Sequence, residues 1–517
     1  MKSDQYWEKF SVQPTDLEYL VNLLLEEEEP RSREALTRAV IQHRHQQLVD
    51  LAQESLSRGR IYRPGEAYEM GETIIFPHLG NMVGEVIELR PGNNPEYEPF
   101  TVVRVQTTEG DEREFAAELP GGHPLDQASY MPAEGADPEE IYQAYGDKVE
   151  DLLVQELEGN PSFVRMGYQW FVKELLVDIP PVQLNIAEAM LDMQEGGPLP
   201  TRDLLEEMDL PDEIPEPLQL FSLEYALEQD NRFDEVGPAG RALWYLQRME
   251  PQEVLEIPEH LRYVPIPYNR SLLSDTMLSL EGRIDDEWAE SSFEGDLEPG
   301  ETVTVTLLYP HWRSGTLPLT DKLAQLFPTA RITDRIRFTF VDGDTDRSFP
   351  GWVARSGRYV YGLADFYEEY QVAPGSYVDL RQGEEPGQIV VEVRSFRSKR
   401  GEWLRTVTVE DGDFSFEVTR YPVYCEFDEL AALGVPDPEA VDALSEDLRR
   451  VPLETLVDQV FRKLAVLSLQ RAVHSKTLHS VINLLRRVPP APMQAILAAG
   501  QQYVSLGDNY WSYRGVE

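Results

Sequence analysis

The segment that decides the fold class lies near the carboxyl end, where residues 502–514 read QYVSLGDNYWSYR. Aromatic and β-branched residues fill both halves of this segment, a composition typical of strands. Between the halves stand Gly507, Asp508 and Asn509, three residue types that tolerate a positive φ. We therefore predict a β-hairpin. Helical periodicity precedes it as far as Ala499, so residues 437–517 are predicted to form a helical domain closed by a small wing.

The same order of elements is expected upstream, in residues 138–250. An amphipathic helix over residues 186–193 is followed by the turn EGGPLPT at 195–201, and Thr201 can cap a second helix. A third helix is predicted over residues 217–230, and strands on either side of a Gly-Pro turn end near Leu246. Three helices followed by a hairpin are typical of a winged helix.

Two other regions have the short strands and turn clusters of small β barrels. In residues 61–137 we predict strands at 72–76, 82–89, 100–105 and 113–116. In residues 301–430 we predict a barrel interrupted by a short helix at 363–370. Residues 1–60 are expected to form N-terminal helices, and the Pro-rich stretch 251–300 a linker with local structure. The predicted fold class is α+β and multidomain, with small β barrels alternating with winged-helix-like helical domains.

Composition limits the functions that the chain can perform. The formal net charge is -47, from 93 acidic and 46 basic residues, so a uniformly phosphate-binding surface is excluded and any nucleic-acid contact requires local basic patches. A single cysteine, Cys425, rules out an internal disulfide and a cysteine-rich zinc site. Neither a signal peptide nor an apolar membrane span is recognisable. We expect a cytoplasmic protein that does not bind a membrane.

The C-terminal segment resembles the winged-helix domain of the bacterial RNA polymerase delta subunit and the HARE-HTH family. The likeness rests on residues 503–514, with an apolar strand, a Gly-Asp turn, a Trp and an Arg. Residues 182–251 resemble the same broad class more weakly. Their second and third helices are strongly acidic, which favours protein contact or scaffolding over phosphate contact.

The middle barrel resembles the DNA-binding pseudobarrel of plant auxin-response factors and of certain restriction-enzyme recognition domains. The residues that carry this resemblance are the tryptophan strand 351–353, the aromatic helix at 361–367 and the glycine turn and strand at 372–380. The resemblance implies a DNA-binding function for residues 301–430.

No familiar catalytic site is recognisable, and we predict neither enzymatic activity, a cofactor nor a metal. Phosphate-binding glycine loops are absent from the sequence, and no pair of histidines has the spacing of a zinc hydrolase. Asp342, Asp344 and Asp346 alternate as in a calcium loop, but Arg347 replaces the required glycine. These aspartates are therefore expected to form a polar turn, and Cys425 to be a buried structural thiol.

Two basic patches stand out against the acidic background. The first has Trp403 and Phe396 interleaved with arginine and lysine, and the pseudobarrel resemblance implies that it forms a hairpin at the end of the barrel. The second runs from Arg449 to Arg487. The residues predicted to bind nucleic acid are Arg394, Arg397, Lys399, Arg400, Trp403, Arg405, Arg471, Lys476, Arg486, Arg487 and Arg514. An exposed basic hairpin without a ligand and a partner-protein surface are the alternatives for the two patches.

Our leading hypothesis is a DNA-binding or transcription-associated regulatory protein without catalytic activity. The alternative is an acidic protein-interaction scaffold or RNA polymerase accessory factor, whose partner is a protein; an enzyme with an unfamiliar site is a third possibility. The distribution of charge distinguishes the first two hypotheses. A contiguous positive face favours DNA, whereas cancellation of the basic patches by neighbouring Asp and Glu favours the scaffold.

Overall fold

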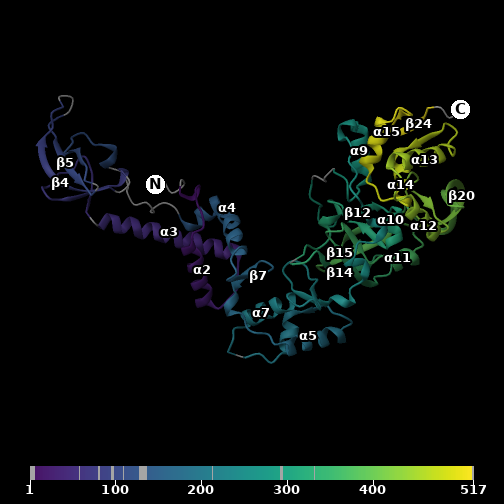
Figure 1. Cartoon of the computed structure of the whole chain (residues 1–517), viewed down its shortest axis with the longest axis horizontal. Coiled ribbons are helices and arrows are strands. Elements are labelled where there is room, and N and C mark those ends of the chain that lie inside the picture. The colour runs from purple at the N-terminus through teal and green to yellow at the C-terminus, as the bar shows by residue number, and fades with distance from the viewer. Residues whose placement is uncertain are drawn as a thin grey trace. The chain divides into compact units, whose positions relative to one another are not determined.

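The protein is a mixed α+β chain built of several domains, as predicted (Figure 1). The computed structural model describes residues 6–57, 59–79, 82–94, 98–108, 110–126, 137–211, 213–290, 295–330 and 332–514, without the side chains of 51–57 and 397–400. The chain divides into two compact parts, Met1–Asp178 with Leu210–Ser222, and Ile179–Asp209 with Leu223–Glu517.

In the first part, a five-stranded sheet follows the N-terminal helices. Its strands are β2 (Arg60–Ile61), β3 (Thr73–Phe76), β4 (Met82–Pro91), β5 (Thr101–Thr107) and β6 (Glu112–Ala117), which pair in sequence order. The predicted strands of residues 61–137 agree with this sheet to within a few residues. Tyr62, Ile74, Phe76 and Val103 are buried in its core, which is a separate small hydrophobic core.

The helices and strands that precede and follow this sheet in the sequence form a second folded structure within the first part. They are α2 (Pro14–Glu27), β1 (Arg31–Ser32), α3 (Arg33–Ser57), α4 (Pro138–Glu158), β7 (Phe163–Met166) and β8 (Gln169–Val172). β1 pairs with β8, and β8 with β7, so the chain before the five-stranded sheet joins the chain after it. The five-stranded sheet is thus an insertion between the second and third helices of one folded structure.

This order of elements occurs three times in the chain. The second set is α5 (Pro181–Met193), β9 (Leu199–Pro200), α6 (Thr201–Glu206), α7 (Glu216–Glu228), β10 (Phe233–Glu235) and β11 (Leu243–Leu246). The third set is α13 (Leu453–Ala465), β22 (Ala472–His474), α14 (Ser475–Leu485), α15 (Pro490–Ala499), β23 (Tyr503–Gly507) and β24 (Tyr510–Tyr513). Each time the first short strand pairs with the last strand of the hairpin. We call each set a helix–hairpin unit. The three helices and the hairpin predicted between residues 186 and 246, and the C-terminal hairpin, are confirmed.

A tryptophan occupies the second position of the last strand in all three helix–hairpin units. Trp170, Trp244 and Trp511 are buried. The indole Nε1 of Trp244 donates a hydrogen bond to Thr201 Oγ1 at 3.0 Å, and that of Trp511 donates one to Ser475 Oγ at 3.0 Å. In these two units the indole therefore links the hairpin to the start of the second helix, and its buried N–H has the partner that it needs.

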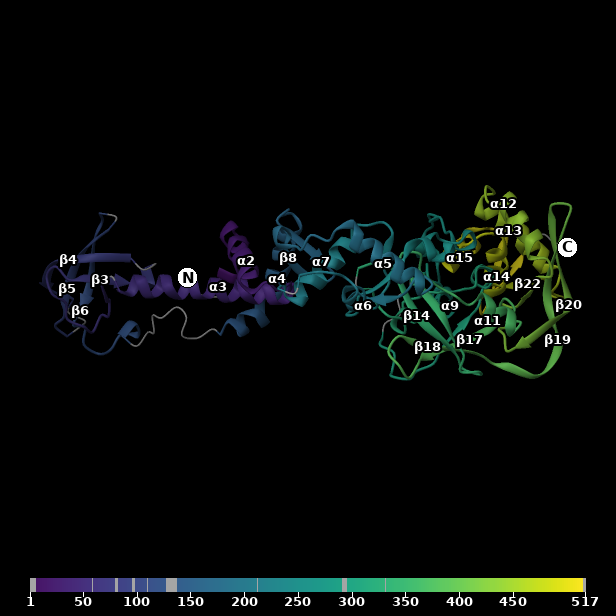
Figure 2. The same ribbon diagram turned by 90° about the horizontal axis from the view of Figure 1, so that it is seen from below.

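Where the middle barrel was predicted, the second part contains a curled seven-stranded sheet ordered β12-β17-β18-β14-β15-β16-β13, whose edge strands β12 and β13 do not pair with each other in the described residues. The strands are β12 (Val303–Thr306), β13 (Thr316–Pro318), β14 (Arg335–Asp342), β15 (Ser348–Ala354), β16 (Tyr359–Tyr361), β17 (Tyr377–Gln382) and β18 (Gln388–Val393). The expected short helix is α11 (Ala364–Glu369). A long hairpin, β19 (Ser395–Glu410) and β20 (Asp413–Cys425), follows the sheet and is joined by β21 (Leu433–Gly434) (Figure 2).

The segment interpreted as a linker, residues 251–300, contributes to the core of the second part. It contains α8 (Gln252–Leu255), the 3-10 helices η5 (Glu259–Leu261) and η6 (Arg270–Leu272), and α9 (Asp275–Ile284). Leu273 and Met277 belong to the same hydrophobic cluster as the third helix–hairpin unit. Both η6 and α9 pack against α15. This segment is therefore a structural element that covers the third unit.

Replacing Ser475 by alanine tests the link between the indole and the helix. The variant Ser475→Ala leaves the buried Nε1–H of Trp511 without its acceptor, which costs about 1–3 kcal/mol. We expect faster hydrogen–deuterium exchange in residues 472–513 by mass spectrometry. The exposed Ser505 lies in the same hairpin, and Ser505→Ala should change the local stability by less than about 0.5 kcal/mol. Equal exchange in both variants would contradict the role of this bond.

Candidate nucleic-acid interface

The first predicted basic patch does not form a hairpin tip, so that prediction was wrong. Residues 395–410 are one continuous strand, and the chain reverses at Asp411 and Gly412, whose φ values are 51° and 77°. Acidic residues Glu410, Asp411 and Asp413 therefore stand at the turn. The sequence around Gly401 looks like a turn because it is polar and contains glycine. The structure instead has a register irregularity in the strand between Ser395 and Arg400.

Two of the arginines in this patch are engaged within the fold. Arg394 bonds to Asp379 at 2.7 Å, with Glu426 at 3.6 Å. Arg405 donates a hydrogen bond to the backbone carbonyl of Glu429, and burial lowers the pKa of its guanidinium. Arg394 is thus paired with carboxylates of the protein itself, whereas Arg405 is held by one backbone carbonyl and its buried Nε has no partner among the described residues.

The other members of the first patch lie along β19. Arg397, Lys399 and Arg400 belong to β19, and their side chains lie outside the described residues. Trp403, by contrast, is 70% exposed. Phe396, the other aromatic residue of this patch, is 36% exposed, so Trp403 is the more exposed of the two.

The second predicted patch is neutralised largely by the protein itself. Lys476 bonds to Asp428 at 2.6 Å; although burial alone would raise the pKa of that carboxyl group, the lysine lowers it. Arg486 donates from Nη2 to the backbone carbonyls of Leu448, Arg449 and Val451. Further ion pairs in this patch are Arg449–Glu259, Arg462–Asp458 and Lys463–Asp413. Arg471, within this patch, and Arg514, beyond it in the sequence, are exposed. The result is not a contiguous positive face.

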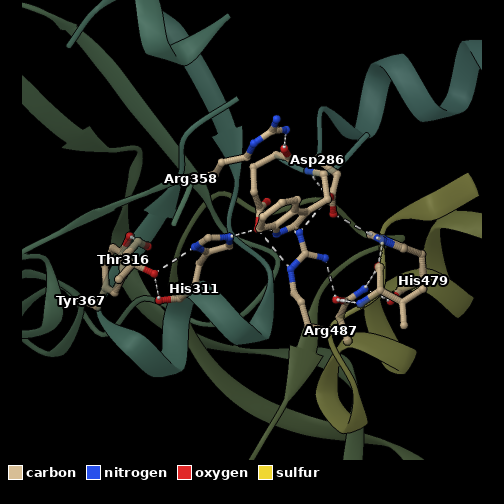
Figure 3. Close-up of polar contacts among 11 residues, drawn as sticks. Asp286, His311, Thr316, Arg358, Tyr367, His479 and Arg487 are labelled. Atoms are coloured by element: carbon tan, nitrogen blue, oxygen red, sulfur yellow. Dashed lines mark hydrogen bonds and ion pairs between the residues drawn. The ribbon is translucent and has the colours of Figure 1, made fainter. Parts of the chain in front are cut away.

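Arg487 is buried, so its predicted contact with phosphate was wrong. The side chain is 2% exposed, and its Nη2 atom lies 2.8 Å from Asp286 and 2.6 Å from Glu287 (Figure 3). Its Nη1 atom also donates to Asn483 Oδ1 at 3.1 Å. A guanidinium held by two buried carboxylates cannot turn toward a nucleic acid without breaking both pairs.

Two histidines complete this buried cluster, as Figure 3 shows. His311 lies 3.2 Å from Glu287 through Nε2 and 2.9 Å from Thr316 through Nδ1. His479 bonds to the Val488 carbonyl at 3.0 Å, and its Nε2 atom lies 3.8 Å from Asp286. Burial, aided by the charge of Arg487, lowers the pKa of His479 to about 3. The imidazole of His479 is therefore neutral at pH 7.

The third helix of each helix–hairpin unit corresponds to the helix that would enter the major groove in a DNA-binding protein of this element order. Helix α4 contains seven acidic residues and one lysine; α7 contains three glutamates and no basic residue. Helix α15 has no charged residue, and its residues from Pro490 to Ala495 are buried, where η6 and α9 pack against it. None of these three helices presents the positive charge that phosphate contact requires.

The sequence did not reveal that α4 belongs to a helix–hairpin unit. The insertion of residues 60–117, with the strands β2 to β6, separates α3 from α4, so no local pattern joins them. The only available signal was the aromatic strand QWFV at Gln169–Val172, which has its Trp where the other two units have theirs.

The remaining candidates for chemistry are structural in the described residues. Asp342 accepts hydrogen bonds from Thr345 and Tyr370, which makes a polar turn as predicted. Cys425 is buried, which raises the pKa of its thiol. Within the described ranges, no group of three His, Cys, Asp or Glu side chains is placed to hold a metal, and no helix has the length and apolar character to span a bilayer.

Comparison with known proteins found no match: no family model, no curated protein and no solved structure matches the chain. The fold nevertheless defines the structural class of the protein. It is a multidomain α+β protein with three helix–hairpin units.

Replacing Arg487 by methionine tests the buried cluster. The variant Arg487→Met keeps most of the side-chain volume but leaves Asp286 and Glu287 buried without their cation, which costs about 3–5 kcal/mol. We expect a clear fall in the melting temperature by calorimetry. The exposed Arg450 gives the matched control Arg450→Met, which should melt like the wild type. The triple variant that also carries Asp286→Asn and Glu287→Gln should recover part of the loss. An unchanged melting temperature in Arg487→Met would contradict the assignment.

A second test uses the pH dependence of stability. His479 has a pKa of about 3 in the folded protein and about 6.5 when unfolded. Between these values the unfolded chain binds more protons, so stability falls as the pH falls below 6.5, by up to about 1.4 kcal/mol per pH unit. Asp286 acts in the opposite direction, because burial raises its pKa.

The comparison that isolates the histidine is between the wild type and His479→Gln, since both contain Asp286. We expect the free energy of unfolding of His479→Gln to fall less steeply between pH 7 and pH 5 in urea titrations. Identical slopes in the two proteins would contradict a neutral buried His479.

Proposed function

We propose that the chain is an acidic protein-binding scaffold without catalytic activity, located in the cytoplasm. The observation that carries this proposal is the character of the three third helices. Two are acidic and one is covered by the chain's own η6 and α9. A winged helix that reads DNA needs an exposed third helix whose positively charged surroundings attract phosphate.

The pairing of the basic patches supports the same proposal. Lys476 and Arg487 are engaged by carboxylates, and Arg486 by backbone carbonyls. In a chain of net charge -47, the pairing of Lys476 and Arg487 with carboxylates leaves an acidic surface. An acidic surface repels nucleic acid and attracts basic partner proteins, through long-range steering more than through contact energy.

An exposed aromatic side chain supplies a place where a protein partner could bury apolar area. Trp403 is 70% exposed and Val418 is 49% exposed. Trp403 pairs with Arg420, and Val418 with Arg405, so the Trp and the Val are diagonal neighbours on one face of the hairpin. Trp and Arg are the residue types that most often carry the binding energy of protein interfaces.

Direct DNA binding is the second candidate function, and one observation favours it. Arg397, Lys399 and Arg400 lie in β19 close in sequence to the exposed Trp403. Phosphate contacts from such a run, with a base stacked on the indole, would bind single strands or duplex ends. In this case the partner is nucleic acid.

Fluorescence anisotropy with labelled random duplex and single-stranded DNA distinguishes the two functions. For the full chain at low salt we expect no saturable binding, because the net charge repels phosphate. In parallel, RNA polymerase is the first protein partner to test, by size-exclusion co-elution with the wild type and with Trp403→Ala.

Either outcome is informative. Co-elution that Trp403→Ala weakens supports the scaffold. DNA binding that weakens steeply with salt and is lost in the triple variant Arg397→Ala, Lys399→Ala and Arg400→Ala would overturn the scaffold proposal in favour of the second candidate.

A further inference from the structure

A cavity of about 440 Å³ lies in the second part of the chain, beside the buried Arg487. One wall comes from η5 and the residues after it, and the other from the carboxyl ends of α12 (Pro438–Leu448) and α14. Its volume falls in the range of small-molecule sites, about 300–1,000 Å³. The segment once interpreted as a linker thus forms half of a concave site.

The walls of this cavity combine apolar surface with positive charge. Val264, Ile266, Leu484 and Leu485 give the apolar surface. Four arginines line the cavity against a single acid, Glu259, which is paired with Arg449 at the cavity itself. Such a concentration of positive charge is unusual in a chain with twice as many acidic as basic residues, 93 against 46.

Two of the four arginines lack a carboxylate partner among the described residues. Arg262 bonds only to the Ile257 carbonyl, through Nε. Arg486 bonds only to backbone carbonyls, all through Nη2. Burial lowers the pKa of Arg486, as expected for a guanidinium that has lost water without gaining a counter-ion.

Arg486 caps the end of α12, but this role does not use all the hydrogen-bond donors that the arginines bring to the cavity. Its Nη2 atom satisfies carbonyls at the end of α12, which any helix end requires. The Nε and Nη1 donors of Arg486 have no partner in the described chain, nor do the two Nη atoms of Arg262. A guanidinium has five donors in a fixed fork that matches the oxygens of a carboxylate or phosphate.

We propose that this cavity binds a small organic anion, whose phosphate or carboxylate group accepts hydrogen bonds from Arg262 and Arg486. The apolar part of the ligand lies against Val264 at the rim and against Leu484 and Leu485. The ligand supplies the negative charge that the cavity lacks. Because it contacts both walls, its binding stabilises the packing of η5 against the third helix–hairpin unit.

Isothermal titration calorimetry of the full chain tests the proposal, with phenyl phosphate and benzoate as anionic probes. Benzyl alcohol, of similar shape and without charge, is the neutral probe. We expect saturable binding of at least one anion, a rise in melting temperature on its addition, and no binding of benzyl alcohol.

The variants locate the site. Arg262 is exposed and Arg450 lies outside the cavity lining, so Arg262→Ala and Arg450→Ala remove the same charge from neighbouring regions. We expect Arg262→Ala to bind the anion roughly tenfold more weakly, because it loses a charge-assisted bond, and Arg450→Ala to bind like the wild type. Val264→Asp, which places an acid at the rim, should also weaken binding. Circular dichroism checks that each variant is folded.

Three results would overturn the proposal. The first is the absence of saturable binding of both anions by the wild type. The second is unchanged affinity in folded Arg262→Ala and Val264→Asp. The third is equal weakening in Arg262→Ala and Arg450→Ala, which would indicate attraction by general surface charge. None of these results bears on whether the chain is a scaffold, since that test uses DNA, RNA polymerase and Trp403.

Discussion

The guanidinium of Arg487, enclosed by Asp286 and Glu287, is the interaction on which the second part of the chain depends. It joins the residues directly after α14, in the third helix–hairpin unit, to a segment 200 residues earlier in the sequence. His311 of α10 (Tyr309–Ser314), next to the seven-stranded sheet, reaches the same Glu287. Three regions of the chain therefore meet at one buried charge, and the solvation that all these groups lose is replaced only while they stay together.

Such a cluster fixes position more than it adds stability. Taking charges out of water costs about as much as their attraction returns, whereas removing one partner is costly. The cluster therefore specifies the conformation: it fixes a single position for residues 285–288 within the second part of the chain. With that segment held, α9 and η6 lie against α15, and Met277 enters the hydrophobic cluster of the third unit. The helix that a DNA-binding protein would expose is thereby turned into a core helix.

The sequence predicted local structure well and long-range structure poorly. Strands such as β14 and β20 and the hairpin at Gly507 follow from residue type and alternation, which act over a few residues. The pairing of β1 with β8 does not, because a whole sheet separates them. Arg487 illustrates the same limit for the site. In sequence it adjoins Arg486 and looks like part of a basic patch, and only the fold brings Asp286 and Glu287 to it.

Charge balance explains why most basic residues of this protein do not form a phosphate-binding surface. Where acids outnumber bases 93 to 46, many cations have a carboxylate nearby, and a local pair competes with any external anion. Lys463 with Asp413 and Arg394 with Asp379 are examples. The cations without a carboxylate partner are therefore more informative about ligand binding than the basic patches of the sequence. A guanidinium that is partly buried and has no carboxylate partner among the described residues, as is the case for Arg486, retains its affinity for an anion, and the cavity beside it has the room to admit one.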